Sequence, residues 1–591
     1  MISSPPEFVR RPARPDDAEA VLGLIPPELH FGPDDLRAEW RRADLERNTW
    51  TWEHEGRLVA YATLRTHGQE RSVNGFVHPD FRGRGLGTAI LRATEARARE
   101  LGARKLDNGI LAADPAGAAL LEANGYRDVR HYYVMTIELE EPPPEPEWPA
   151  GLEPRPFEHE HARAFWACDD EAFRDEDGYE QQPFEEFVTR RVESPRFDAA
   201  LWTAVWDGDE IAATVIVDRK RFGTGWIGGL GVRRPWRRRG LGRALLLRSF
   251  SQLYERGERH VSLNVHTENA TGATRLYEGV GMRIEREDVL YQKELVVVRE
   301  PGADDAEGIA EACNELSTQL YGVTDVSAEE IRHWLSLPNV ETAVAELGGQ
   351  ICGYMDFHRH DEGPIGVDLR VRPSAWGRGV ADALLDRAEA AAGRERAVHC
   401  FVAERDDEGR GVLERRGYRL IRHSFAMQID FDGPPAPPEW PAGIAVRFYA
   451  GEEDLRAGYE CHQEAFADHW EFRPEPLEVW RRYGVDMPDF DPSLWWLAEA
   501  GGEVAGICLA RWHASGDPRF GWVDVLGVRK AWRGRGLGLA LLRHSFCDFA
   551  ARGVTRVGLF VDAENTTGAV RLYERAGMRP ARRTDIYERT P

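Results

Sequence analysis

The sequence contains a long internal repeat. The segment LGVRRPWRRRGLGRALLLRSF (230–250) returns as LGVRKAWRGRGLGLALLRHSF (526–546), and ENATGATRLYEGVGMR (268–283) returns as ENTTGAVRLYERAGMR (564–579), at the same offset. Residues 148–295 and 440–591 are therefore copies of one domain. Proline-rich segments precede both copies, at 140–151 and 433–443, and predict extended spacers.

Two weaker copies fill the rest of the chain, at residues 1–143 and 296–432. They carry VHPDFRGRGLGTAIL (77–91) and VRPSAWGRGVADALL (371–385). The sequence therefore indicates a unit of two domains, one weak and one strong copy, that occurs twice. We refer to the four predicted domains 1–143, 148–295, 296–432 and 440–591 as the first to fourth repeats. In the second repeat, the apolar pattern predicts strands at 201–206, 210–217, 226–232 and 261–265 and a helix at 240–256. Each repeat is thus a β-rich α/β domain.

The sharpest motif is Arg-x-x-Gly-x-Gly between a predicted strand and a predicted helix. Glycines let the backbone approach a ligand closely, and the free amides at a helix start favour an anion. The loop therefore predicts a site for a phosphate or pyrophosphate, which flanking arginines would strengthen. It lacks the third glycine of a dinucleotide fingerprint and the Gly-Lys-Ser/Thr of a Walker loop. Its members are Arg237, Arg238, Arg239, Gly240, Leu241 and Gly242; Arg533, Gly534, Arg535, Gly536, Leu537 and Gly538; and Arg82, Gly83, Gly85 and Gly87.

Charge and cysteine usage exclude several classes of protein. Acidic residues outnumber basic ones, 100 to 76, for a net charge of −24. This negative charge disfavours nucleic-acid binding, including binding by the basic run 233–239. It would attract a cationic amine toward the protein. The seven cysteines form no Cys-x-x-Cys pair, which argues against a disulfide framework, a zinc ribbon or a redox dithiol. With no signal peptide or membrane span in the sequence, a cytoplasmic protein is expected.

This combination of motifs resembles the GNAT acetyltransferase superfamily, and the resemblance covers the whole chain as four tandem GNAT domains. Their pairing, with strings such as VDAENTTGAVRLYERAGM (561–578), further resembles the double-GNAT enzymes of the mycothiol synthase family. The resemblance implies a mixed, mostly antiparallel sheet flanked by helices, whose two middle strands part to hold acetyl-CoA, with the glycine loop on its pyrophosphate. Leu230 and Val232, and likewise Leu526 and Val528, would then offer backbone groups to the pantetheine and the acetyl carbonyl.

The resemblance also implies candidate catalytic residues. Tyr277 and Tyr573 lie at the position where a family tyrosine protonates the leaving thiolate. Asn269 and Asn565 are expected to cap the helix that carries the tyrosine, with contact to CoA as an open alternative. The general base is left open between Asp524, on the strand before the loop of the fourth repeat, and His266 or Asp562 on the next strand.

The weaker copies differ at these positions. Leu121 and Leu413 replace the tyrosine, and in the third repeat Trp376 and Ala381 replace the first Arg and the last Gly of the loop. We therefore expect catalytic sites in the second and fourth repeats, with the first able to bind CoA and the third degenerate. The acidic segment 168–180 and the aromatic segment 461–480 are expected to form the acceptor pockets.

The sequence thus predicts an acetyl-CoA-dependent N-acetyltransferase that acts on a small-molecule amine, without nucleic-acid or membrane partners. The alternative is a non-catalytic, CoA-responsive scaffold. Whether the chain self-associates stays open.

Overall fold

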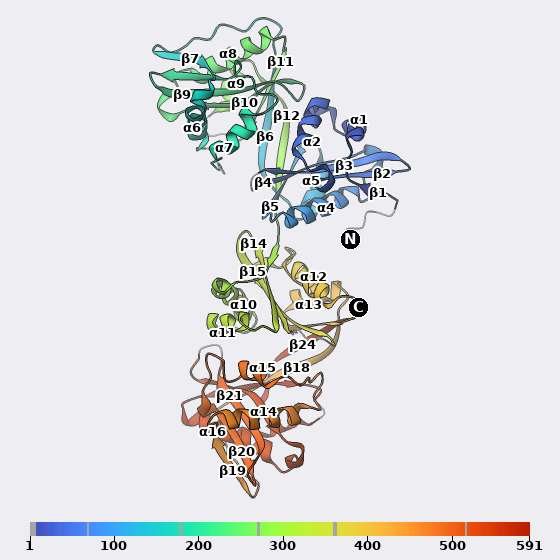
Figure 1. The fold of residues 1–591 in the computed structure, drawn as a ribbon, viewed down its shortest axis with the longest axis vertical. Helices are drawn as coiled ribbons and strands as arrows, with labels where there is room; N and C mark the ends of the chain where they lie inside the picture. The colour runs from blue at the N-terminus through green and yellow to red at the C-terminus, as the bar shows by residue number, and fades with distance from the viewer. Residues whose placement is uncertain are drawn as a thin grey trace. The chain divides into compact units, whose positions relative to one another are not determined.

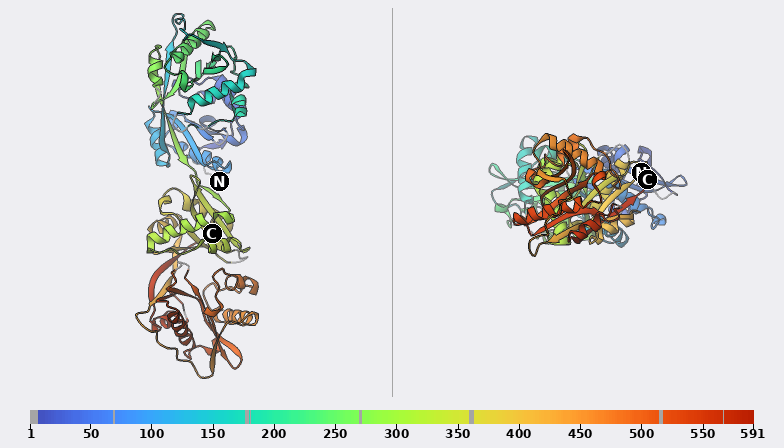
Figure 2. Two further views of the ribbon diagram at one scale, coloured as in Figure 1. Left: turned by 90° about the vertical axis from the view of Figure 1, so that its left-hand side faces the viewer. Right: turned by 90° about the horizontal axis from the view of Figure 1, so that it is seen from below.

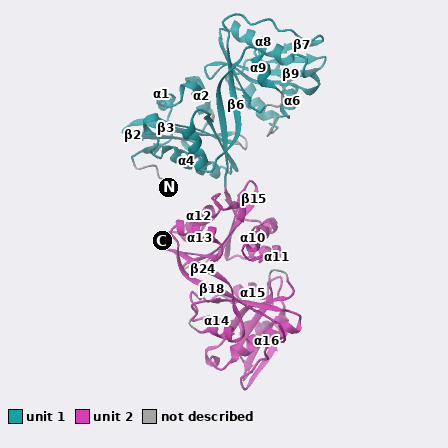
Figure 3. Cartoon of the chain, turned by 180° about the vertical axis from the view of Figure 1, so that it is seen from behind, with its two compact units in different colours: residues 1–295 teal, residues 296–591 magenta. Residues whose placement is uncertain are grey.

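The computed structural model describes residues 7–67, 70–175, 179, 181–268, 272–358, 363–513, 517–565 and 567–591. Its contacts divide the chain into two compact units, residues 1–295 and 296–591 (Figure 3). This division falls at the expected boundary between the second and third repeats. The finer division into four domains stays a prediction.

The described residues of unit 1 form one 12-stranded sheet in the order β1-β2-β3-β4-β5-β12-β6-β11-β10-β9-β8-β7 (Figure 1). Its strands are β1 (Val9–Arg11), β2 (Thr49–His54), β3 (Arg57–His67), β4 (Glu70–Val77), β5 (Lys105–Leu111), β6 (Arg127–Glu138), β7 (Leu152–Pro156), β8 (Thr203–Asp207), β9 (Glu210–Arg221), β10 (Thr224–Val232), β11 (His260–His266) and β12 (Arg283–Glu294). Its helices are α1 (Ala18–Leu22), α2 (Pro33–Arg42), α3 (Leu45–Asn48), α4 (Leu86–Glu100), α5 (Pro115–Ala123), α6 (Ala162–Phe173), α7 (Phe184–Phe187), α8 (Leu241–Glu255) and α9 (Ala273–Glu278).

Unit 2 repeats this plan in the order β13-β14-β15-β16-β17-β24-β18-β23-β22-β21-β20-β19 among its described residues. Its strands are β13 (Val297–Arg299), β14 (Val340–Leu347), β15 (Gln350–His358), β16 (Ile365–Val371), β17 (Val398–Ala403), β18 (Arg419–Asp430), β19 (Ile444–Phe448), β20 (Trp495–Ala500), β21 (Glu503–Trp512), β22 (Phe520–Val528), β23 (Arg556–Asp562) and β24 (Arg579–Arg589). Its helices are α10 (Ala306–Tyr321), α11 (Ala328–Leu335), α12 (Val380–Ala392), α13 (Asp407–Arg415), α14 (Glu452–Phe466), α15 (Leu477–Arg482), α16 (Leu537–Ala551) and α17 (Ala569–Arg575).

Both sheets are mixed and mostly antiparallel, as expected. Among the described strands of unit 1, the parallel neighbours are β4 with β5 and β10 with β11. The predicted elements of the second repeat are confirmed, with small shifts at their ends, as β8, β9, β10, α8 and β11. The side chains of α8 that face the sheet, such as Leu245, Phe250 and Leu253, are buried, which accounts for the apolar period of this helix.

The two repeats of each unit exchange their last strands. β6, which ends the first repeat, pairs with the whole of β11 of the second, from His266 with Tyr132 to His260 with Glu138. β12, which ends the second repeat, pairs with β5 of the first. β6 and β12 also pair with each other and run side by side through unit 1 (Figure 1; Figure 2). β18 and β24 do the same in unit 2, so each pair of repeats shares one sheet.

Among the described residues, no helix combines the length and the apolar composition that crossing a bilayer requires.

Candidate active site

The middle strands of the second repeat part from each other. Among the described residues, β10 pairs with β11 from Gly225 to Ile227, and no pair follows although both strands continue. β10 stays bonded to β9 as far as Val232, while β11 stays bonded to β6 as far as His266. Leu230 therefore lies with Val232 on the diverging part of β10.

The fourth repeat has the same arrangement and adds a side chain. β22 pairs with β23 from Phe520 to Val523, and its later residues, Leu526 and Val528 among them, leave that partner. The register of β22 against β21 slips at Asp524, which is the extra residue of a β-bulge. Gly228 is the extra residue at the matching place in the second repeat. The two sites therefore differ in the side chain that the bulge presents.

The glycine loops end in uncapped helix starts. Gly240 and Gly536, the residues before α8 and α16, both adopt a left-handed φ of 87°, and neither helix has a side-chain cap. The first amides of each helix are therefore available to an anion, which the helix dipole favours. The third repeat keeps this conformation at Gly379, with φ 83°, although Trp376 and Ala381 depart from the motif.

The first arginine of the motif is used inside the protein. Arg237 donates hydrogen bonds to the backbone oxygens of Val232 (2.9 Å) and Ala172 (3.0 Å) and forms an ion pair with Asp175 (2.6 Å). Arg533 makes the matching bonds in the fourth repeat, to Val528 (3.2 Å) and Ala465 (2.7 Å). These arginines tie the strand end to α6 and α14. The exposed Arg238, Arg239 and Arg535 are better placed to reach a phosphate.

The last glycine of the motif is explained by helix packing. A Cβ atom at Gly242 would come within 2.8 Å of Leu276, and one at Gly87 within 2.5 Å of Leu120. The third repeat has Ala381 at this position and the smaller Val412 at the leucine position. Ala381 is therefore a repacked contact between two helices, and it does not by itself indicate loss of CoA binding.

This packing predicts a coupled pair of substitutions. We expect Gly242→Ala to lower the free energy of unfolding, because overpacking costs about 1–3 kcal/mol and the better helix propensity of alanine offsets only about 1 kcal/mol of it. In the presence of Leu276→Val the cost of Gly242→Ala should be smaller, because the valine leaves room for the new methyl group. Urea unfolding of the two single variants and the double variant measures the coupling, and additive effects would contradict this account.

The two candidate tyrosines are buried at the ends of matching helices. Tyr277 lies on α9 and Tyr573 on α17, and each is 8% exposed. Burial raises the pKa of Tyr573 above its usual value. The phenol is therefore protonated at neutral pH, as a general acid must be, but burial also makes it a weaker acid. Leu121 and Leu413 are buried at the corresponding positions of the other repeats.

The expected asparagine cap is wrong for the fourth repeat. The residue before α17 is Gly568, and the Asn565 side chain instead accepts a hydrogen bond from the Thr567 amide (2.8 Å) in a tight turn. α9 likewise begins after Gly272, and Asn269 lies outside the described residues. Asn565 does not cap the helix because its side chain is used in this turn, before the first helical residue, Ala569.

A cavity of about 360 Å³ lies beside the bulge of β22. Asp524 and Arg511 line it, and Arg511 Nε is 3.1 Å from Asp524 Oδ2. Burial raises the pKa of Asp524, and Arg511 partly offsets this. The Asp524 side chain nevertheless keeps 41% of its surface exposed, so the cavity gives a ligand access to a carboxylate that is more basic than usual.

Both repeats of unit 2 supply walls of this cavity. His358, on β15 of the third repeat, shares a hydrogen bond of 3.0 Å between its Nδ1 and the Tyr483 hydroxyl, and both residues line the cavity. Glu330, on α11, bonds Arg511 at 2.9 Å. His462, from the aromatic segment 461–480, is also a lining residue. Burial lowers the pKa of His462 to about 4, so its ring is neutral at neutral pH.

Comparison with known proteins identifies the family. The sequence profile of the Acetyltransferase (GNAT) family matches residues 19–126, 134–282, 309–418 and 456–578. The chain belongs to this family. It is an N-acetyltransferase built from tandem GNAT repeats.

Two relatives of this GNAT acetyltransferase each match less than half of its length. It is 32% identical over 248 residues to the mycothiol acetyltransferase of Streptomyces coelicolor, covering 41% of this chain and 77% of that protein. It is 31% identical over 293 residues to that of Geodermatophilus obscurus, covering 48% and 94%. Among solved structures, a GCN5-related N-acetyltransferase from Sphaerobacter thermophilus is 34% identical, with a TM-score of 0.45, over 50% of this chain and 97% of that one.

The other candidate bases of this GNAT acetyltransferase have different surroundings. Asp562 is held by two hydrogen bonds of 2.8 Å from Arg422. His266 ends β11 and packs edge-on against the Tyr132 ring at 5.6 Å. At the bulge of the second repeat, Arg191 takes the place of an acidic side chain and donates to the Gly228 oxygen at 3.3 Å.

The acidic segment 168–180 is largely occupied with internal bonds. Asp170 pairs with Arg174 at 2.6 Å and accepts from Tyr179 and Gln181. Asp175 pairs with Arg237. Residues 176–178 and 180 lie outside the described residues. The described carboxylates of this segment therefore stabilise the fold around the glycine loop.

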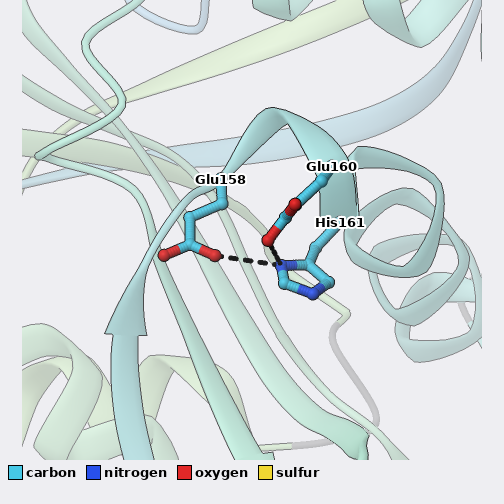
Figure 4. Close-up of side chains that lie close together, drawn as sticks. All are labelled: Glu158, Glu160 and His161. Carbon is cyan, nitrogen blue, oxygen red and sulfur yellow. Dashed lines mark ion pairs between the residues drawn. The ribbon is translucent and has the colours of Figure 1, made fainter.

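One group of described side chains could in principle hold a metal. Ligand atoms of Glu158, Glu160 and His161 lie within 4.8 Å of one another on the surface (Figure 4). His161 Nδ1 is 3.2 Å from Glu158 and 4.0 Å from Glu160. These contacts between the imidazole and the carboxylates account for the cluster, so we assign no metal to it.

Proposed function

We propose that the fourth repeat transfers an acetyl group from acetyl-CoA to the amine of a small molecule, and that the second repeat holds a second site of the same kind. One observation carries this proposal: β22 joins three functional features in sequence. Asp524 borders the cavity, Leu526 and Val528 lie on the diverging backbone, and the uncapped start of α16 follows after the glycine loop.

Each feature suits one requirement of acetyl transfer. The amides at Gly536 and Leu537, with the Arg535 side chain, would hold the pyrophosphate of acetyl-CoA, which supplies the thioester when bound. Backbone amides of the diverging strand would donate to the acetyl carbonyl oxygen. Asp524 would accept a proton from the attacking amine, and Tyr573 would give one to the departing sulfur.

An amine panel tests the proposal. The full chain is incubated with acetyl-CoA and each amine, and mass spectrometry measures acetylated product while a thiol reagent measures released CoA. We expect product from at least one amine, with less product in the Tyr277→Phe and Tyr573→Phe variants. Tight acetyl-CoA binding without any product would instead favour the scaffold alternative.

The glycine loop allows a matched test of acetyl-CoA binding. Gly536 and Gly553 lie at opposite ends of α16, with φ of 87° and 86°, and neither has an atom near its missing Cβ. Both changes to Val should therefore cost similar stability, about 1–3 kcal/mol from backbone strain. Only Gly536→Val should weaken the binding of acetyl-CoA at one site, by roughly ten-fold or more. The reason is that it disturbs hydrogen bonds to a charged group, which contribute about 1.5–3 kcal/mol each.

Calorimetric titration with acetyl-CoA measures both variants. We expect two or three sites in the unmodified chain, one fewer tight site in Gly536→Val, and no change in Gly553→Val. Equal loss in the two variants would show that the effect comes from stability and would contradict the assignment of the loop.

A further inference from the structure

We propose that the acceptor of the fourth-repeat site is a cationic amine on an apolar, aromatic body, bound in the cavity beside Asp524. This inference rests on the proposed acetyl transfer for its purpose, and the binding test below is independent of that reaction.

The cavity holds more negative than positive charge. Three carboxylates line it, those of Glu475, Asp489 and Asp524, against the single guanidinium of Arg511 among its described lining residues. Arg511 is shared further, because it also bonds Glu330 at 2.9 Å. A ligand that carries its own positive charge would therefore balance the site, whereas an anionic ligand would be repelled.

Two of these carboxylates have unused bonding capacity. Asp489 Oδ1 is buried without a hydrogen-bond partner among the described residues, and its other oxygen is 3.5 Å from Arg511. The Glu475 carboxylate makes no hydrogen bond or ion pair with a described residue, and burial raises its pKa. A buried acceptor such as Asp489 Oδ1 is costly unless a donor reaches it, and the partly buried Glu475 carboxylate is free to accept as well. The N–H groups of an ammonium ion are suitable donors.

The remaining walls are aromatic. Trp480 and Trp495 lie 5.9 Å apart between ring centres, and Phe490 is 5.0 Å from Trp495. Both tryptophans are less than one-tenth exposed. The cavity volume is at the lower end of the range for small-ligand sites, so it suits a compact ring or short apolar chain better than a large hydroxylated molecule. Aromatic faces also attract an ammonium ion.

Calorimetry of the full chain with four probes, without acetyl-CoA, tests the proposal. Phenethylamine is cationic and apolar, 2-phenylethanol lacks the charge, phenylalanine adds a carboxylate, and glucosamine is cationic but hydroxylated. We expect phenethylamine to bind at least ten-fold more tightly than each of the others. Equal or tighter binding of glucosamine or of 2-phenylethanol would overturn the proposal.

Two variants locate the binding. Glu475→Gln and Asp489→Asn keep the side-chain size but remove a negative charge. Each should weaken the binding of phenethylamine about ten-fold. Glu478→Gln, an exposed residue outside the cavity, should not. Unchanged affinity in both cavity variants would overturn the proposal, and thermal unfolding of each variant confirms that it is folded. Binding of phenethylamine without its acetylation would count against the proposed function alone.

Discussion

Replacing Tyr573 by phenylalanine is expected to lower the turnover of the fourth-repeat site by about 10²–10⁴-fold, the usual contribution of a positioned acid. The thiolate of CoA would then leave without a proton from the protein. Acetyl-CoA affinity should be unchanged, because Tyr573 is a buried residue and the glycine loop is a separate element. The assay uses a Tyr277→Phe background, so that the second repeat contributes little turnover.

Tyr587→Phe provides the matched control for Tyr573→Phe. Tyr587 is also buried, but its hydroxyl lies on β24 and donates to Glu414 at 2.9 Å. This control should lose some stability and keep its turnover. If Tyr573→Phe retains full turnover while folded, Tyr573 is not the acid.

Asp524→Asn is expected to reduce kcat/KM of the fourth-repeat site by about 10²–10⁴-fold, because the amide cannot accept the proton of the amine. Burial raises the pKa of Asp524, so in the unmodified chain activity should increase as the pH rises through that raised pKa and the carboxylate ionises. The variant should lose this dependence and keep only the dependence that comes from deprotonation of the free amine.

Asp517→Asn is the control for Asp524→Asn, since Asp517 lies in the turn before β22 and bonds Arg519. It should leave both the rate and the pH profile unchanged. A profile of Asp524→Asn that keeps the ascending limb of the unmodified chain would assign the base to another group, and neutral His462 in the same cavity is then the first to examine.

Local patterns determined much of the fold. The strands and the helix expected between 201 and 266 appear with small shifts, because their apolar spacing matches one buried face. The left-handed conformation of the glycines before α8 and α16 agrees with the motif, because glycine adopts that conformation without a steric cost. The motif alone did not show what each arginine does. The structure shows that Arg237 donates hydrogen bonds to the backbone oxygens of Val232 and Ala172.

The cavity could be predicted only in part. The aromatic segment 461–480 was recognisable by composition, and it supplies His462, Glu475 and Trp480 to the lining. Asp489 and Arg511 were missed. A charged residue in the apolar run 504–512 of β21 was the available signal for Arg511, but its partner Glu330 lies 181 residues away, in the third repeat.

The sequence by itself determined the repeat, the family, the glycine loop and the candidate tyrosines, since each depends on residues close together in the chain. Tertiary structure decided that β6 and β12 cross between repeats and that β15 and α11 of the third repeat help to build the cavity of the fourth. Strand pairing and cavity lining depend on long-range packing and on the pairing of buried charges. No local spacing records these contacts.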